Sequence, residues 1–333
     1  MRTALTRALA AVIACGSVAL TAAGAGAQSL PKDAAARVEL YPIPTLTLSD
    51  QQFLTGSPDG RPVIVSGELR IAQGTGRLPV VMLMHGSSGV GAAMEPWVHS
   101  FNAMGISTLV IDGFTGRGLT VVGPNQALLG RLNLIVDIYR SLDILAHHPR
   151  VDPERIALMG FSRGGQAALF ASLDRFNALW NKSGIRFAAY IPFYPDCSTS
   201  YVGDTEVADK PIRIFHGTPD DYNPVASCKA YIARLQEAKR DAVLTEYPES
   251  EHAFDIGLLG VSNKVVSANA QTVRNCHIKE GESGVLMNAD TQVPFTYQDP
   301  CVERDPHVGG NPETAEQARK AVSDFLAALF KLG

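Results

Sequence analysis

The 333-residue sequence has few charged side chains (19%), no run of basic residues longer than two, and a formal net charge of -4. It therefore gives no electrostatic reason to expect nucleic-acid binding. No CxxC or HxxxH spacing occurs, so we expect no metal site. Beyond the N-terminus no apolar stretch is long enough to span a bilayer. The hydrophobic content of 46% can nevertheless build a substantial core, in one large or two ordinary domains.

The first 27 residues have the three parts of a secretory signal. Arg2 and Arg7 are followed by an apolar stretch over residues 8–23 and by Ala25-Gly26-Ala27. We expect cleavage after Ala27 and a periplasmic or secreted protein with no stable membrane insertion after cleavage. An alternative is a lipid anchor on Cys15, because residues 12–15 (VIAC) resemble a lipoprotein box.

Four cysteines follow the signal, an even number that suggests two disulfides in an exported chain. They are Cys197, Cys228, Cys276 and Cys301. Three pairings are possible, and pairing of sequence neighbours closes the shortest loops. Four buried free thiols are the alternative.

Six short apolar runs look like strands buried on both faces, as in a parallel sheet. Their residues are 78–84, 106–111, 155–159, 187–193, 211–215 and 242–247. Helix-like segments with apolar residues three and four apart alternate with them, at 128–146, 166–176, 227–239 and 313–332. This alternation predicts a doubly wound α/β domain with a mostly parallel sheet and helices on both faces.

Two regions fit the alternation less well. Residues 28–77 contain Val63–Ile71, which we expect to form a short antiparallel addition to the sheet. Residues 256–310 are polar and hold two cysteines, so we expect a disulfide-stapled insertion near the active site. No repeat or domain boundary is visible, and we therefore expect one domain over residues 28–333.

The stretch GFSRGG, residues 160–165, matches the GxSxG pattern between a predicted strand and a predicted helix. The glycines permit a tight turn that lifts Ser162 above the sheet, as required of a nucleophile. The alternative is a glycine turn with a helix-capping serine.

A serine nucleophile needs a histidine base and an acid that orients the base. Asp220 and Asp221 follow one predicted strand, and His252 follows the next. Both loops leave the carboxyl ends of strands, where open α/β sheets build their sites. We predict the triad Ser162, Asp220 and His252, with Asp221 as the alternative acid.

Two backbone N–H groups are candidates for an oxyanion hole. One belongs to Arg163, at the start of the helix after the serine, and the other to Ser87 in the loop MHGSSGVG, with Ser88 as the alternative. These groups predict acyl transfer, in which Ser162 attacks a carbonyl and water later releases the acyl group.

The residues resemble an α/β-hydrolase of the dienelactone hydrolase family, from about Leu78 to Phe254. The resemblance lies in MHGSSG, DGFTGRG (residues 112–118), GFSRGG, HGTPDDYNP and EHAFD. It implies the α/β-hydrolase fold, the triad and the absence of a cofactor. Cys197 and Cys228 stand at places similar to an exported branch of the family, which supports pairing between them.

The sequence departs from the dienelactone enzymes at three places, one of which is a glutamate that contacts their cysteine and has no clear match in HGSSG. Ser162 replaces their cysteine nucleophile, and Ile256 stands where one of their carboxylate-binding arginines falls. Arg117 loosely matches their other arginine and is a possible substrate-binding residue, as is Arg163. Such arginines can equally satisfy backbone carbonyls or salt bridges.

We therefore expect an exported serine hydrolase that cleaves a carboxylic ester or lactone, with a small-molecule ester as substrate and no cofactor. Two alternatives are a peptidase of related fold and a non-catalytic binding protein that retains the fold. Reactivity of Ser162 separates the enzymes from a binding protein.

Overall fold

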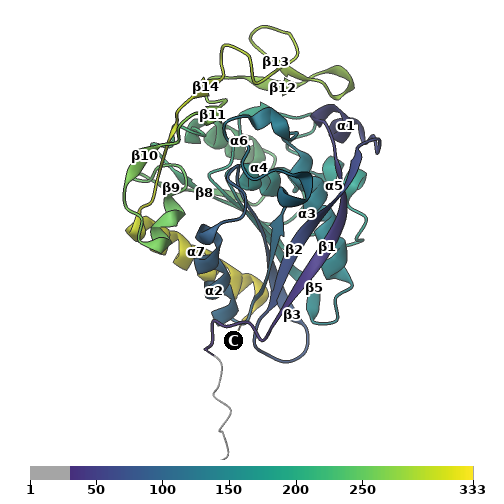
Figure 1. Ribbon diagram of the computed structural model, residues 1–333, viewed down its shortest axis with the longest axis vertical. Coiled ribbons are helices and arrows are strands. Elements are labelled where there is room, and N and C mark those ends of the chain that lie inside the picture. The colour runs from purple at the N-terminus through teal and green to yellow at the C-terminus, as the bar shows by residue number, and fades with distance from the viewer. Residues whose placement is uncertain (1–30, 333) are drawn as a thin grey trace, which may run out of the picture. The chain divides into compact units, whose positions relative to one another are not determined.

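An eight-stranded sheet runs through the computed structural model, which describes residues 31–332 (Figure 1). The predicted signal peptide 1–27 and Cys15 lie outside the described residues. The strand order is β1-β2-β4-β3-β5-β6-β8-β9. The strands are β1 (Arg37–Thr47), β2 (Arg61–Ile71), β3 (Leu78–Met84), β4 (Ser107–Asp112), β5 (Val151–Phe161), β6 (Ala189–Phe193), β8 (Ile212–Gly217) and β9 (Ala242–Tyr247).

Six of these strands are parallel, from β4 to β9 across the sheet, and they correspond to the six predicted apolar runs. Side chains alternate between the two faces of a strand. In β3, Val81 and Leu83 enter one core cluster, whereas Val80, Met82 and Met84 enter the other. The predicted α/β fold with a mostly parallel sheet is therefore confirmed.

Helices cover both faces of the sheet (Figure 1). α2 and α7 contribute to one core cluster, and α1, α3, α4, α5 and α6 to the other. None of the helices within residues 31–332 combines the length and the hydropathy that a membrane span requires. The helices are α1 (Asp50–Thr55), α2 (Glu95–Ala103), α3 (Asn133–Ala146), α4 (Arg163–Phe170), α5 (Asp174–Trp180), α6 (Val225–Glu237) and α7 (Pro312–Phe330).

The N-terminal part of the sheet is larger than the sequence predicted. β1 pairs with β2 over eleven residues in antiparallel register, and β2 pairs with β4 in the same sense. β1 was not predicted, because Pro42 and Pro44 interrupt its strand pattern. β1 is the edge strand, where a residue without an N–H is tolerated.

The segment 166–176, predicted as one helix, is instead divided between α4 and α5. Leu173 has extended dihedral angles and forms a β-bridge with Val207. The Ser172 hydroxyl donates to the Leu169 carbonyl oxygen at 2.6 Å and helps to end α4. A tertiary contact therefore overrides the helical periodicity here.

Residues 256–310, which we call the insertion, form short strands that pair with one another and with the main body. They are β10 (Lys264–Val266), β11 (Gln271–Thr272), β12 (Ile278–Glu280), β13 (Leu286–Asn288), β14 (Glu303–Arg304) and β15 (His307–Gly309). β10 pairs with β15 and β11 with β14, so the outgoing and returning chains run side by side. β12 pairs with β13 and, in parallel, with β7 (Thr199–Ser200), which lies after β6.

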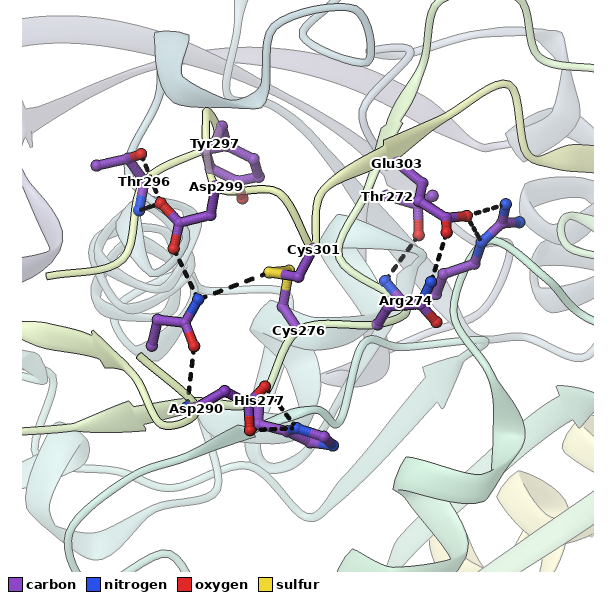
Figure 2. The surroundings of a disulfide bond; sticks show 12 residues. Thr272, Arg274, Cys276, His277, Asp290, Thr296, Tyr297, Asp299, Cys301 and Glu303 are labelled. Atoms are coloured by element: carbon purple, nitrogen blue, oxygen red, sulfur yellow. Dashed lines mark hydrogen bonds and ion pairs between the residues drawn. A yellow bond between two sulfur atoms is a disulfide. The ribbon is translucent and has the colours of Figure 1, made fainter. Parts of the chain in front are cut away.

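Both disulfides join sequence neighbours, Cys197 to Cys228 and Cys276 to Cys301. The first ties the segment after β6 to α6. The second lies inside the insertion, where Asn288 donates to the Asp299 carboxylate at 2.9 Å nearby (Figure 2). The predicted disulfide-stapled insertion is therefore confirmed.

Arg117 lies in the turn after β4, and its guanidinium contacts the Asp137 carboxylate of α3 at 2.7 and 2.9 Å. The Arg117 side chain is 1% exposed and that of Asp137 is fully buried. Arg117 also donates to the carbonyl oxygens of Leu46 and Gly113, so it connects β1, β4 and α3. These are the salt-bridge and carbonyl contacts that were the alternative to substrate binding, and a role of Arg117 in binding substrate stays a prediction.

Breaking this buried pair should be costly, because it leaves a charge without a partner. We expect Asp137→Asn to lower the free energy of unfolding by about 3–5 kcal/mol, measured by urea unfolding. Asp324→Asn is the control, since it removes an ion pair with Lys320 on the exposed face of α7 and should change stability little. Equal losses in both variants would contradict the role given to Arg117.

Removing the disulfide of the insertion should free a chain loop in the unfolded state. The cysteines are 25 residues apart, so Cys276→Ser with Cys301→Ser should destabilise the protein by about 3 kcal/mol by loop-closure entropy. Urea unfolding under oxidising conditions measures the loss. Limited proteolysis should then cut first within 277–300, whereas unchanged stability and unchanged cleavage would refute the prediction.

Candidate active site

Ser162 occupies a sharp turn between β5 and α4, with φ 53° and ψ −115°. A non-glycine residue rarely adopts a positive φ, and such strain persists only where the surroundings impose it. A Cβ atom on Gly160 would lie 2.0 Å from the Gly164 carbonyl oxygen, and one on Gly164 would lie 2.2 Å from the Met84 carbonyl oxygen. Only glycine fits at these two positions, so the GxSxG spacing is a packing requirement of the turn.

Ser162, His252 and Asp220 form one hydrogen-bonded chain. The Ser162 Oγ lies 2.9 Å from His252 Nε2, and His252 Nδ1 lies 2.8 Å from Asp220 Oδ2. Because Nδ1 faces a carboxylate, it carries the proton, and Nε2 is left to accept from the serine hydroxyl. The backbone N–H groups of Tyr222 and Asn223 each donate to Asp220 Oδ1 at 2.8 Å and fix the carboxylate.

Asp221, the alternative acid, points to the insertion instead. His307 donates to its carboxylate through both the backbone N–H, at 2.7 Å, and Nδ1, at 2.8 Å, and Arg274 lies 3.2 Å away. Burial opposes ionisation of Asp221, but the His307 hydrogen bonds and the Arg274 charge outweigh it and lower the pKa of Asp221. The two neighbouring aspartates therefore have different partners.

The two predicted oxyanion donors lie close to Ser162. Arg163 is the next residue, and a Cβ on Gly86, which precedes Ser87, would lie only 3.1 Å from the Ser162 Cβ. Within residues 31–332 neither backbone N–H has a hydrogen-bond acceptor. Both amides are therefore available to a substrate oxygen beside Ser162.

Aromatic rings hold the His252 imidazole on two sides. The Tyr222 ring stacks on it at 4.6 Å between centroids, and the Tyr194 ring meets it edge-on at 4.7 Å. The Tyr194 hydroxyl donates to Asp255 at 2.5 Å, and Trp97 Nε1 donates to the same carboxyl at 3.0 Å. Burial raises the pKa of Asp255 despite these two donors.

Sequence reasoning missed Tyr194, Tyr222 and Asp255. Tyr194 directly follows β6, Tyr222 stands two residues after Asp220, and Asp255 stands three residues after His252. Their positions just past parallel strands were the signal that could have identified them.

A pocket of about 360 Å³ opens beside Ser162 and His252. Its walls are mostly apolar, and the side chains of Met94, Phe161 and Ile256 are among them. The insertion supplies further wall residues, Ser267, Ala268, Ala270 and Val308. The insertion therefore shapes the pocket without providing a member of the serine–histidine–aspartate chain.

The insertion is hydrogen-bonded to the loops that carry these residues. Thr272 donates to the Tyr222 carbonyl oxygen at 2.6 Å, and Gly309 donates its backbone N–H to the His252 carbonyl oxygen at 3.0 Å. Arg274 donates to the Glu303 carboxylate (Figure 2) and to the Asp221 carbonyl oxygen, the latter at 2.9 Å. Hydrogen bonds therefore connect the insertion, which forms part of the pocket wall, to the loops that carry Asp221, Tyr222 and His252.

Comparison with known proteins agrees with this architecture. The family model of the dienelactone hydrolase family matches residues 71–272, well over half of the chain. Thiohydrolase aneE of Aspergillus aculeatus is 31% identical over 127 residues, which are 38% of this chain and 37% of that protein. The chain thus matches little more than a third of the length of this curated relative.

A solved structure of similar fold is a dienelactone hydrolase-like promiscuous phosphotriesterase from metagenomic libraries. It is 15% identical, with a TM-score of 0.54, over 88% of this chain and 98% of that one. This likeness shows the fold. The extent of the family match, together with the GxSxG turn at the end of β5, leads to one conclusion: the chain belongs to the dienelactone hydrolase family.

Proposed function

We propose that the protein is an exported serine hydrolase that cleaves a carboxylic ester or lactone through the triad Ser162, His252 and Asp220. The observation that carries the proposal is the pair of hydrogen bonds of 2.9 and 2.8 Å that join the three side chains. A serine hydroxyl gains nucleophilicity when a positioned base accepts its proton, and the aspartate keeps the base in the required tautomer.

The proposed reaction has two stages. Ser162 Oγ attacks the substrate carbonyl carbon while its proton passes to His252 Nε2, and the backbone N–H groups of Arg163 and Ser87 stabilise the oxygen anion. The C–O bond to the leaving alcohol then breaks, and His252 returns the proton to that alcohol. In the second stage a water molecule gives its proton to His252, attacks the acyl carbon and releases the acid and the free serine.

The pocket supports an apolar portion in the substrate. Its volume of about 360 Å³ lies in the range of small-molecule sites, and its apolar walls remove hydrocarbon surface from water. Because the curated relative is named a thiohydrolase, thioesters belong in the same substrate screen as oxygen esters and lactones. The apolar pocket gives no specific support to the alternative hypothesis of a peptidase.

Export is supported by the cysteines. Both disulfides persist in an oxidising compartment such as the periplasm or the cell exterior. The signal at residues 1–27 was inferred from sequence and remains a prediction, as does the alternative anchor at Cys15.

The first test is labelling of the disulfide-intact protein with a fluorophosphonate, followed by mass mapping. We expect one adduct on Ser162, because His252 activates this hydroxyl, and we expect Ser162→Ala to abolish both the adduct and turnover of short-chain esters. A folded protein that takes no adduct would overturn the hydrolase proposal and favour a binding function. Turnover of peptide amides but not of esters would favour a peptidase.

The second test separates the two neighbouring aspartates. Asp220→Asn should lower kcat by about 10⁴-fold, because His252 loses the acceptor that fixes its tautomer. Asp221→Asn should retain most of the activity and instead lose stability at about pH 7. A large loss of kcat in Asp221→Asn alone would reverse the assignment.

The stability effect should also depend on pH in a defined direction. Ionised Asp221 stabilises the folded state above the ordinary aspartate pKa of about 4, and this contribution is lost as the pH falls through its lowered folded-state pKa. The difference in thermal midpoint between wild type and Asp221→Asn should therefore shrink below about pH 4.

A further inference from the structure

A second and much smaller cavity, of about 40 Å³, also reaches Ser162 and Ser87. In contrast to the apolar pocket, it is bordered by charged and amide side chains, among them Arg131, Arg163 and Gln166. Within residues 31–332, three buried nitrogens of these side chains have no hydrogen-bond acceptor: Nε of Arg131, Nε of Arg163 and Nε2 of Gln166. The cavity beside the serine is therefore bordered by two buried guanidinium groups and an amide that each keep an unused donor, and by the Asp196 carboxylate, which pairs with Arg131.

The charge of Arg163 distinguishes it from two other buried arginines. Arg117 pairs with Asp137, and Arg131 pairs with Asp196. Arg163, which is 6% exposed, donates only to neutral oxygens: the side-chain oxygen of Gln126 at 2.5 Å and the carbonyl oxygens of Gln126, Leu129 and Gly130.

Within residues 31–332, no carboxylate lies within ion-pair distance of the Arg163 guanidinium. The Asp50 carboxyl acts on it only at longer range, and burial raises the pKa of Asp50. Burial lowers the pKa of Arg163 itself, as expected for a cation removed from water without a counter-charge.

The Arg163 side chain is also linked to the loop after β3 that holds Ser87. Arg163 holds the Gln126 side-chain oxygen, and the Gln126 amide donates to the Ser87 hydroxyl at 3.1 Å. Gln126 thus links the two residues whose backbone N–H groups are the proposed oxyanion donors. These hydrogen bonds hold the guanidinium at the border of the small cavity that Ser87 and Ser162 also line.

We propose that the side chain of Arg163 contributes electrostatically to catalysis: its buried, unpaired positive charge is balanced by the negative charge that forms on the substrate oxygen when Ser162 attacks. The inference rests on the proposed function, since it requires an oxyanion at this place. Preorganised charge in a site shielded from water stabilises the transition state more than the neutral substrate. Its effect therefore falls on kcat rather than on KM.

The test gives Arg163 an internal counter-ion. Gln166 lies three residues after Arg163 in the first turn of α4, so its side chain is a neighbour on the same helix face. Gln166→Glu should raise the thermal midpoint, because it compensates a buried cation near a helix N-terminus. The same variant should lower kcat for a neutral short-chain ester by about ten- to a hundredfold, less than the loss of a direct oxyanion donor, with little change in KM.

Gln166→Met is the matched control, because it removes the amide without adding charge. It should reduce kcat far less than Gln166→Glu. Equal kcat values in the two variants, or a lower thermal midpoint in Gln166→Glu, would overturn the inference.

A second pair of variants covers the case in which Gln166→Glu does not fold. Neither Arg163→Lys nor Arg163→Met can keep the full set of guanidinium hydrogen bonds to Gln126, Leu129 and Gly130, but only lysine keeps the charge. Arg163→Lys should retain the higher kcat, and equal kcat values would show that Arg163 is merely structural. A wild-type protein that takes no fluorophosphonate adduct refutes the proposed function, whereas an active wild type with a fully active Gln166→Glu refutes this inference alone.

Discussion

The close approach of the first turn of α4 to the carboxyl end of β3 is the constraint on which the site depends. The chain passes so near to the Met84 and His85 carbonyl oxygens that a methyl group at Gly164 would collide with both. This contact sets the loop after β3 against the serine turn and places Gly86 beside Ser162. Ser162 and the loop that holds Ser87 are therefore positioned by backbone packing, before any side chain is considered.

The two buried carboxyl groups near His252 differ in what they contribute. Asp220 accepts from two backbone N–H groups and from the imidazole, so both of its carboxylate oxygens have hydrogen-bond donors. Asp255 accepts from Tyr194 and Trp97, and burial raises its pKa. Asp255 fixes the Tyr194 hydroxyl, and the Tyr194 ring packs against the His252 imidazole. Asp255 therefore restricts rotation of the imidazole without accepting a proton from it.

Sequence patterns predicted the parallel strands and the hydrogen-bonded chain because both follow from position. Ser162, Asp220 and His252 each follow a strand of one sheet, and strands of equal direction bring their carboxyl ends to one edge. Neighbour pairing of the cysteines also agreed with the structure. The break between α4 and α5 could not be predicted, because it depends on the bridge from Leu173 to Val207 across the fold. The partner of Arg117 was equally hidden, since nothing in the sequence selects Asp137 from the other acids of the chain.

The two ends of the insertion meet on the main body. A Cβ on Gly257 would collide with the backbone of Asn311, and one on Gly310 with that of Val261. The segment therefore leaves the body and returns to it at almost the same point, with its own disulfide and its own strand pairs between. It supplies pocket wall but no member of the serine–histidine–aspartate chain. Side-chain changes at its wall residues can therefore alter which molecules enter the pocket, whereas loss of the whole insertion would also remove hydrogen bonds from the loops of Tyr222 and His252.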